Sequence, residues 1–302
     1  MALSISRMDL DGNCSPIALV TKILKLEPNL KIPVPIEELA CKLDINSIQE
    51  LTTAGYEGGL ITDEARSSGD ILIKKGMYHQ RRRFTIGHEL AHFLISYHKP
   101  SAPSGFLCDK SAMSNWNLKE QVKAKKMEAE ANQFSSLLLM PPPHLRKILN
   151  RDKFTYLDRV FEIHEHFDVS KEAAARSFVE YNPECVAVLI CKDGQLVSKY
   201  KGRKFPWIKI VNGQKMPGIS ELYCFKGSTG KTSHLQSTDA REWLDIKNNQ
   251  RVPKIYEQVV HQSRGYAMIM LKLAVSEEND YDPEENMTSK QRLERRTHNW
   301  QK

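Results

Sequence analysis

The chain lacks the features of an exported or membrane-inserted protein. Its 302 residues contain no uninterrupted apolar run of roughly 18 residues, the length that a membrane-spanning helix needs. The first residues, Met1 to Asp11, show no basic start followed by an apolar stretch, so a secretory signal is not expected either. We therefore expect a cytoplasmic protein that has no membrane partner.

Cysteine and glycine patterns argue against two further classes. The six cysteines are scattered and include no C-x-x-C pair, so we expect reduced thiols rather than a disulfide framework. The segment Gly227 to Thr232 resembles a phosphate-binding P-loop in composition, but only two residues separate its glycines. A P-loop needs a longer spacer and a surrounding βαβ unit, so this interpretation is rejected.

What the chain does contain is one short pattern with a defined chemistry, H-E-x-x-H. His88 and His92 are four residues apart, so in an α-helix they project from one face, one turn apart. Two imidazoles placed in this way can bind a single Zn²⁺. Glu89 lies roughly 100° further round the helix, where its carboxylate can take a proton from a metal-bound water. The pattern therefore predicts the parts needed for peptide-bond hydrolysis, with Glu89 as the general base.

The residues around this pattern favour a helix that packs on a core. Ile86, Leu90, Phe93 and Tyr97 recur at helical spacing, and they form an apolar stripe on the side opposite the two histidines. The helix can therefore bury one side while its histidines face a cleft.

A catalytic zinc site needs a third protein ligand, and the residues alone leave alternatives open. His98 has the spacing of the third metzincin histidine, but Ile95 stands where those enzymes need a glycine. The other source is the segment 126–140, whose apolar residues also recur at helical spacing and which ends before three prolines. A glutamate from this second helix, Glu128 or Glu130, would complete a His-His-Glu ligand set.

Two stretches of the sequence, GHELAHFL and EAEANQFSSLLLMP, together resemble the ImmA/IrrE family of zinc metallopeptidases. The family pattern is G-H-E-[LI]-[GAS]-H followed by E-x-x-A-N-x-F-A-x-x-L-L-M-P. Matched by position, the resemblance implies that His88, His92 and Glu128 bind Zn²⁺ and that Glu89 is the general base. Glu130 is not matched to a ligand. The chain departs from the pattern at Ser135 and Ser136, where alanine is usual.

The resemblance also implies a function and a partner. Family members are endopeptidases that cut transcriptional repressors of the helix-turn-helix type, so the expected substrate is such a protein and the expected role is regulation of stress or mobile-element genes. Two alternatives stay open. One is a metal-binding regulatory or interaction protein with weak or no protease activity, and the other is a DNA-binding regulator.

The predicted fold class is α+β, with four segments along the chain. A helical, zincin-like peptidase core with a small antiparallel sheet is expected over 1–143, and a helix-turn-helix-like helical segment over 144–182. A mainly antiparallel β domain is expected over 183–274, followed by a disordered charged tail over 275–302. Within the core, the short strand 71–74 could form a sheet edge that binds an extended peptide.

The helix-turn-helix-like segment is a weak match to a DNA-binding motif. DNA reading needs basic or amide side chains at the start of the second helix. Only Lys171 and Arg176 qualify, against Glu172 and Glu180. Structural packing is therefore favoured over DNA contact, and nucleic acid is not expected as a partner.

The sequence does not rank the donors that could stabilise a tetrahedral oxyanion. Four side chains able to donate a hydrogen bond are candidates: Tyr78, Tyr97, His98 and His144.

Overall fold

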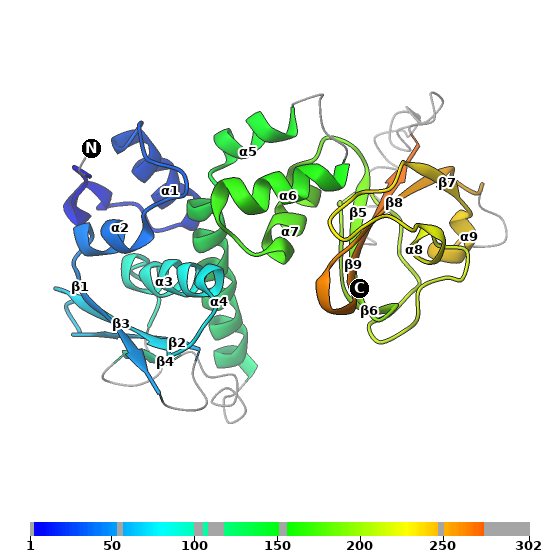
Figure 1. The fold of residues 1–302 in the computed structure, drawn as a ribbon. Helices are drawn as coiled ribbons and strands as arrows, with labels where there is room; N and C mark the ends of the chain where they lie inside the picture. Colours follow the sequence, from blue (N-terminus) through cyan, green and yellow to red (C-terminus); the bar gives the residue numbers. More distant parts are fainter. Residues whose placement is uncertain are drawn as a thin grey trace, which may run out of the picture. The chain divides into compact units, whose positions relative to one another are not determined.

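The computed structural model divides the chain into two compact units, Met1–Tyr181 and Asn182–Lys302 (Figure 1). Secondary structure is of the predicted α+β class. The tail expected to be disordered, 275–302, lies outside the described residues, and the finer domain boundaries within each unit stay predictions. The structure describes residues 3–52, 57–99, 105–107, 118–150, 156–246 and 251–274.

The first unit begins with a short 3-10 helix, η1 (Arg7–Leu10), and two α-helices, α1 (Pro16–Leu26) and α2 (Ile36–Lys42). Helix α1 starts where the Ser15 hydroxyl accepts a hydrogen bond from the Ala18 amide and where proline occupies the first turn. Both helices bury an apolar face, as the sequence pattern predicts.

A four-stranded sheet follows, with strand order β1-β3-β2-β4. Strand β1 pairs with β3 in parallel, whereas β2 pairs antiparallel with both β3 and β4. The sheet is therefore mixed, and the prediction of an antiparallel sheet was wrong in this respect. Alternating residues predict strands, but not which strands become neighbours. The strands are β1 (Ile45–Leu51), β2 (Gly58–Thr62), β3 (Gly69–Lys74) and β4 (Gly105–Leu107).

The expected peptide-binding edge is also wrong. Strand β3 contains the predicted segment 71–74, but it has a hydrogen-bonded neighbour on each side. Its backbone donors and acceptors are therefore used within the sheet, and an added peptide strand could pair only with an edge strand. The edges of this sheet are β1 and β4.

Helix α3 (His79–Leu94) carries the H-E-x-x-H residues and lies over one face of the sheet, with α4 (Leu118–Leu139) beside it (Figure 1). The predicted apolar stripe is buried at Ile86, Leu90 and Phe93, whereas Tyr97 lies beyond the helix end and is 39% exposed. Burial of this stripe fixes which side of α3 faces the core.

Helices α3 and α4 approach closely at Gly87. A Cβ atom there would lie 2.6 Å from the Ser135 hydroxyl oxygen, so a larger side chain has no room. Ser135 is fully buried, and its hydroxyl donates a 2.8 Å hydrogen bond to the Phe84 carbonyl. The serine that departs from the family pattern therefore links the two helices of the site.

Three further helices complete the first unit: α5 (Pro142–Leu149), α6 (Tyr156–Phe167) and α7 (Lys171–Tyr181). Asp168, in the turn between α6 and α7, has a positive φ of 50°. Its carboxylate accepts hydrogen bonds from His79 and Gln80, and its carbonyl accepts one from Arg83. The turn of the helix-turn-helix-like segment is therefore bound to the start of α3.

The second unit is built on a five-stranded sheet of order β6-β5-β9-β8-β7, antiparallel throughout. This confirms the mainly antiparallel β character predicted for it. Strands β5 and β6 form a hairpin, with Asp193 and Gly194 both at positive φ in its turn. The strands are β5 (Val186–Lys192), β6 (Gln195–Lys201), β7 (Gln236–Thr238), β8 (Ile255–His261) and β9 (Tyr266–Leu273).

Two short helices, α8 (Glu221–Cys224) and α9 (Ala240–Trp243), and a 3-10 turn, η3 (Ser263–Gly265), complete this unit. The Ser220 hydroxyl accepts a hydrogen bond from the Leu222 amide and caps the start of α8. Fully buried Trp243 lies in the core of this unit. Among the helices that the structure describes, none has the length and apolar character needed to cross a membrane.

Candidate metal centre

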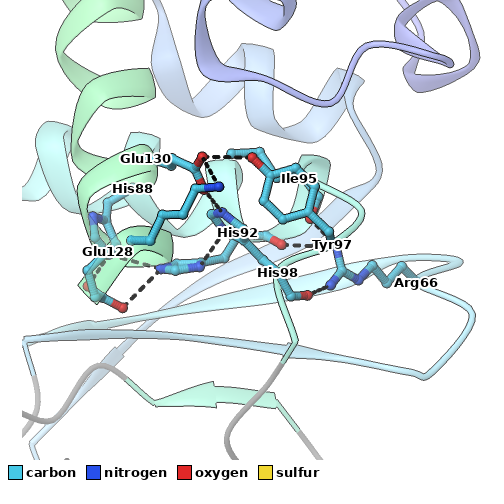
Figure 2. Close-up of polar contacts among 9 residues, drawn as sticks. Arg66, His88, His92, Ile95, Tyr97, His98, Glu128 and Glu130 are labelled. Atoms are coloured by element: carbon cyan, nitrogen blue, oxygen red, sulfur yellow. Dashed lines mark hydrogen bonds and ion pairs between the residues drawn. The ribbon is translucent and has the colours of Figure 1, made fainter. Parts of the chain in front are cut away.

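Three side chains from α3 and α4 converge on one point, as Figure 2 shows. The Nε2 atoms of His88 and His92 are 3.1 Å apart. The two carboxylate oxygens of Glu128 lie 3.2 Å from His88 Nε2 and 3.4 Å from His92 Nε2. The structure therefore brings together the three residues that the sequence and the resemblance pointed to.

The distances between these donor atoms fit one metal ion. Ligands of a tetrahedral ion with bonds of about 2.0–2.1 Å are separated from one another by about 3.3–3.4 Å. The two imidazole nitrogens are 3.1 Å apart, and each lies 3.2 or 3.4 Å from a different oxygen of the Glu128 carboxylate. With one ligand atom taken from each residue, the three atoms lie within 4.8 Å of one another, close enough to share one ion. Two imidazole nitrogens and a carboxylate oxygen are also a donor set typical of catalytic zinc sites.

His88 is oriented by Asn132, one turn after Glu128 on α4. The Asn132 side-chain oxygen lies 3.0 Å from His88 Nδ1. Because an amide oxygen can only accept a hydrogen bond, Nδ1 is the nitrogen that carries the proton. Nε2, the atom that faces Glu128 and His92, is therefore the ring nitrogen that can bind a metal ion.

The electrostatics of the cluster favour an ionised carboxylate. Burial alone would raise the pKa of Glu128, but hydrogen bonds to His88 and His92 outweigh burial and hold that pKa well below its usual range. Burial lowers the pKa of His88, but the hydrogen bond to Glu128 and the charges of Glu89 and Glu128 give a net increase. The pKa of His92 is lowered, chiefly by burial.

Glu89 lies beside the cluster rather than in it. Its side chain is almost fully buried, at 1% exposure. The carboxylate lies against Gly58 of β2, where a Cβ atom would approach its Oε1 to 2.7 Å. Its charge contributes to the raised pKa of His88. A glycine in the neighbouring strand thus provides the space that this carboxylate occupies.

His98, the alternative third ligand, lies behind His92 and not at the cluster. Its Nδ1 is 3.0 Å from His92 Nδ1, on the side of that ring away from Glu128. The side chain is completely buried. Burial, followed by the effect of His92, lowers the pKa of His98 to about 4, so the ring is neutral near pH 7.

The four candidate oxyanion donors are not gathered at the cluster. Tyr97 and His98 are both hydrogen-bonded to Glu130. Tyr78 is 81% exposed at the start of α3, roughly 15 Å along the helix axis from His88. His144 is on α5, where burial and the charges of Lys147 and His166 lower its pKa.

The three arginines at the start of α3 are paired with carboxylates of the same chain. Arg81 pairs with Glu57, Arg82 with Glu37, and Arg83 with Asp168. These pairs bind α3 to neighbouring segments of the first unit.

Sequence reasoning missed the residues that orient the two histidines and the end of α3. Asn132 was not a candidate for a role at the site, and Glu130 was a candidate only as an alternative third ligand. Arg66 was not singled out at all, although its guanidinium donates hydrogen bonds to the carbonyls of Ile95 and His98. Only Asn132 gave a signal, its four-residue spacing from Glu128.

The fold and the site together define an α+β protein that carries a His-His-Glu cluster on two packed helices. Residues 42–178 match the model of a peptidase family whose domain is described as IrrE N-terminal-like. This match covers α3 and α4 with all three cluster residues. Residues 42–178 thus match a domain of the ImmA/IrrE family, which supports the resemblance seen in the motifs.

Comparison with solved structures finds a fold likeness across both units. A Mycobacterium tuberculosis transcriptional regulator matches with a TM-score of 0.52 and 10% sequence identity. The match covers 85% of this chain and 75% of that one. At this identity the likeness concerns the fold alone. No match was found among curated proteins.

Proposed function

We propose that this protein is a zinc-dependent endopeptidase. The observation that carries the proposal is the His88, His92 and Glu128 cluster, whose ligand atoms lie within 4.8 Å of one another, close enough to bind one ion. Glu89 follows the first of these ligands directly, as a general base must. Membership of a peptidase family over residues 42–178 supports the same reaction class.

In this proposal each side chain has a separate task. His88, His92 and Glu128 would hold the ion, which when bound would supply a Lewis acid for the scissile carbonyl and lower the pKa of a water molecule. Glu89 accepts the proton of the attacking water at its carboxylate and then donates it to the nitrogen of the leaving amine. Asn132 keeps the His88 proton on Nδ1, so that Nε2 remains a ligand atom.

The proposed substrate is a transcriptional repressor of the helix-turn-helix type. The support for this is the family resemblance, together with the transcriptional regulator of similar fold. Such a substrate acts on DNA, so the enzyme would meet it in the cytoplasm. We also propose the finer domain division, with a core over 1–143, a helical segment over 144–182 and a β domain over 183–274.

The test of peptidase activity is a digest of a proteome-derived peptide mixture by the zinc-loaded, full-length chain, read by mass spectrometry. We expect new termini that depend on zinc and disappear in Glu89→Gln and His88→Ala. Equal cleavage by Glu89→Gln and wild type would contradict the assigned general base. Absence of any cleavage would favour the second candidate described below.

The substrate class needs its own experiment. Purified helix-turn-helix repressors and unrelated proteins of similar size would be incubated with the zinc-loaded enzyme and with Glu89→Gln. We expect cleavage of a repressor at one or a few sites and no cleavage of the unrelated proteins. Cleavage of both groups at similar rates would argue for a protease without this specificity.

The second candidate is a metal-binding regulator with little or no protease activity. The observation that favours it is the shared fold with the M. tuberculosis transcriptional regulator, a likeness that extends over 85% of this chain. In that case the metal would stabilise the first unit, and the activity would lie in binding a partner. The peptide digest separates the two candidates, because only the peptidase requires Glu89.

A further inference from the structure

A second buried histidine stands directly behind the ligand His92. His98 is 0% exposed, and its Nδ1 lies 3.0 Å from His92 Nδ1. The opposite ring nitrogen of His92, Nε2, faces His88 and Glu128. His98 therefore contacts His92 on the side away from the metal cluster, as Figure 2 shows.

Glu130 of α4 continues this chain of contacts. One carboxylate oxygen of Glu130 lies 3.2 Å from His98 Nε2. The other accepts a 2.9 Å hydrogen bond from the Tyr97 hydroxyl and lies 3.8 Å from the ammonium of Lys126. Both carboxylate oxygens of Glu130 therefore have partners, and each of them is placed to accept.

These contacts determine where the protons lie. An ionised carboxylate can only accept, so His98 must donate from Nε2 to Glu130. A neutral imidazole has a single N–H, so Nδ1 of His98 must accept, and His92 donates to it from Nδ1. The lone pair of His92 is then on Nε2, the atom that faces the metal cluster.

Arg66 holds His98 in the position that this arrangement needs. Its guanidinium donates to the carbonyl oxygen of His92 at 3.2 Å, to that of Ile95 at 2.8 Å, and to that of His98. It therefore binds the last carbonyls of α3 and folds the following segment back. The side chain comes from the turn between β2 and β3, where Arg66 itself has a positive φ of 51°.

We propose that His98 is a positioning residue that, with Glu130, forms a carboxylate–histidine–histidine relay behind His92. The relay fixes the proton of His92 on Nδ1, orients its ring and strengthens Nε2 as a ligand. This inference rests on the metal site of the proposed function. The two histidine ligands then have different hydrogen-bond partners behind them. His88 donates to the neutral amide of Asn132, whereas His92 is connected through His98 to the Glu130 carboxylate.

The test is the zinc affinity of the full-length protein, measured by competition with a chromophoric chelator at fixed pH. Loss of an outer partner of a metal ligand typically weakens metal binding by about 10–100-fold. We expect a weakening of that size in His98→Leu and a loss of about tenfold in Glu130→Gln. His98→Gln should restore most of the affinity, because its amide can accept from His92 and donate to Glu130.

A matched control comes from the start of α3, the helix that carries His92. His79 is paired with Asp168 and is 63% exposed in its side chain. The change His79→Leu removes an imidazole from α3 without touching the relay, so its zinc affinity should equal that of wild type. Thermal unfolding of the metal-free variants identifies any that fail to fold, and Glu130→Gln carries the test if His98→Leu is among them.

The outcomes separate the relay from the metal site. If wild type binds zinc and His88→Ala does not, but His98→Leu and Glu130→Gln bind as tightly as wild type, the relay is wrong and the site stands. If His98→Leu loses zinc as completely as His88→Ala, His98 is a ligand and the relay is again wrong. If wild type binds no zinc, the proposed function and the relay both fail.

Discussion

Glu89 and Glu128 are both carboxylates beside the same two histidines, and their surroundings separate their roles. Glu128 lies against Nε2 of both imidazoles, and its interactions with the two rings hold its pKa well below the usual range. Glu89 is buried against Gly58 and is not among the three groups that converge. One carboxylate is therefore suited to hold a cation, and the other to move a proton.

The first prediction at this scale concerns Glu89. The change Glu89→Gln keeps the size of the side chain but removes its ability to accept a proton. General acid–base catalysis contributes about 10²–10⁴-fold, so kcat for peptide cleavage should fall by roughly that factor. Zinc content, measured by elemental analysis, should stay that of wild type. Loss of zinc in this variant would show that Glu89 is needed to form the site.

A second prediction concerns Glu257 in the second unit, which is 1% exposed and hydrogen-bonded to the Ser220 hydroxyl. Burial raises its pKa from 4.5 to about 7. Because the unfolded chain then releases this proton at lower pH than the folded chain, stability should fall as pH rises from about 4.5 to about 7 and change little above.

The variant Glu257→Gln should remove this pH dependence. As pH rises across that range, the free energy of unfolding of wild type should fall, relative to that of the variant, by on the order of 3 kcal/mol. Denaturant titrations at several pH values, followed by tryptophan fluorescence, measure the shift. An equal pH dependence in both proteins would mean that Glu257 titrates normally.

At the scale of elements, the site depends on how closely α3 packs on its neighbours. Gly58 in β2 leaves space for Glu89, and Gly87 in α3 leaves space for Ser135. Neither glycine has a positive φ, so the reason for each is close approach and not backbone conformation. Both positions offer a test in which one methyl group is added.

Gly58→Ala should impair catalysis more than metal binding. The new methyl group would lie 2.4 Å from Thr85 Cγ2 and 2.7 Å from Glu89 Oε1, so Glu89 must move. Misplacement of a catalytic group by about 1 Å can cost around 10²-fold in rate. We expect a reduction of about 10–100-fold in kcat with zinc content unchanged. The control is Gly218→Ala, where nothing lies within 4 Å, and equal rates in the two variants would contradict the account.

Gly87→Ala should weaken the contact between α3 and α4. Overpacking of this kind costs about 1–3 kcal/mol, and Ser135→Ala alone should cost about 1 kcal/mol through loss of its hydrogen bond to Phe84. The double variant should lose less than the sum of both, since removing the hydroxyl makes room for the methyl group. Chemical unfolding of the four proteins measures the coupling, and strict additivity would contradict a direct contact.

The elements also show how far the sequence could predict this structure. Helix α3 and its cluster were predictable, because a period of 3.6 residues places His88 and His92 on one face and the apolar stripe on the other. Strand β8 was missed, since Glu257 and Gln258 interrupt its apolar pattern. Both are buried with partners distant in sequence, Ser220 and Ser233, which no local pattern reveals. The parallel pairing of β1 with β3 is likewise a long-range choice.

The same distinction applies to the site. The ligands could be predicted because they lie within two short motifs of defined spacing. The outer residues could not, because Arg66 comes from a distant turn and Glu130 reaches His98 only through the packing of α4 on α3. Tertiary contacts, not local spacing, bring these groups to His92.

At the scale of the whole molecule, the residues of the proposed reaction all lie in the first unit. All three cluster residues, Glu89 and the relay lie between Met1 and Tyr181, within one compact unit. The family match ends at residue 178, so the five-stranded sheet of the second unit lies outside it. The chain thus combines a peptidase-family unit with an antiparallel β unit.

The central claim is that His88, His92 and Glu128 together hold one zinc ion. The most direct measurement is the zinc content of the purified, dialysed full-length chain beside His88→Ala and Glu128→Gln, by elemental analysis. We predict one zinc ion per chain in wild type and almost none in either variant. A wild-type chain without zinc, or zinc retained in both variants, would contradict the claim.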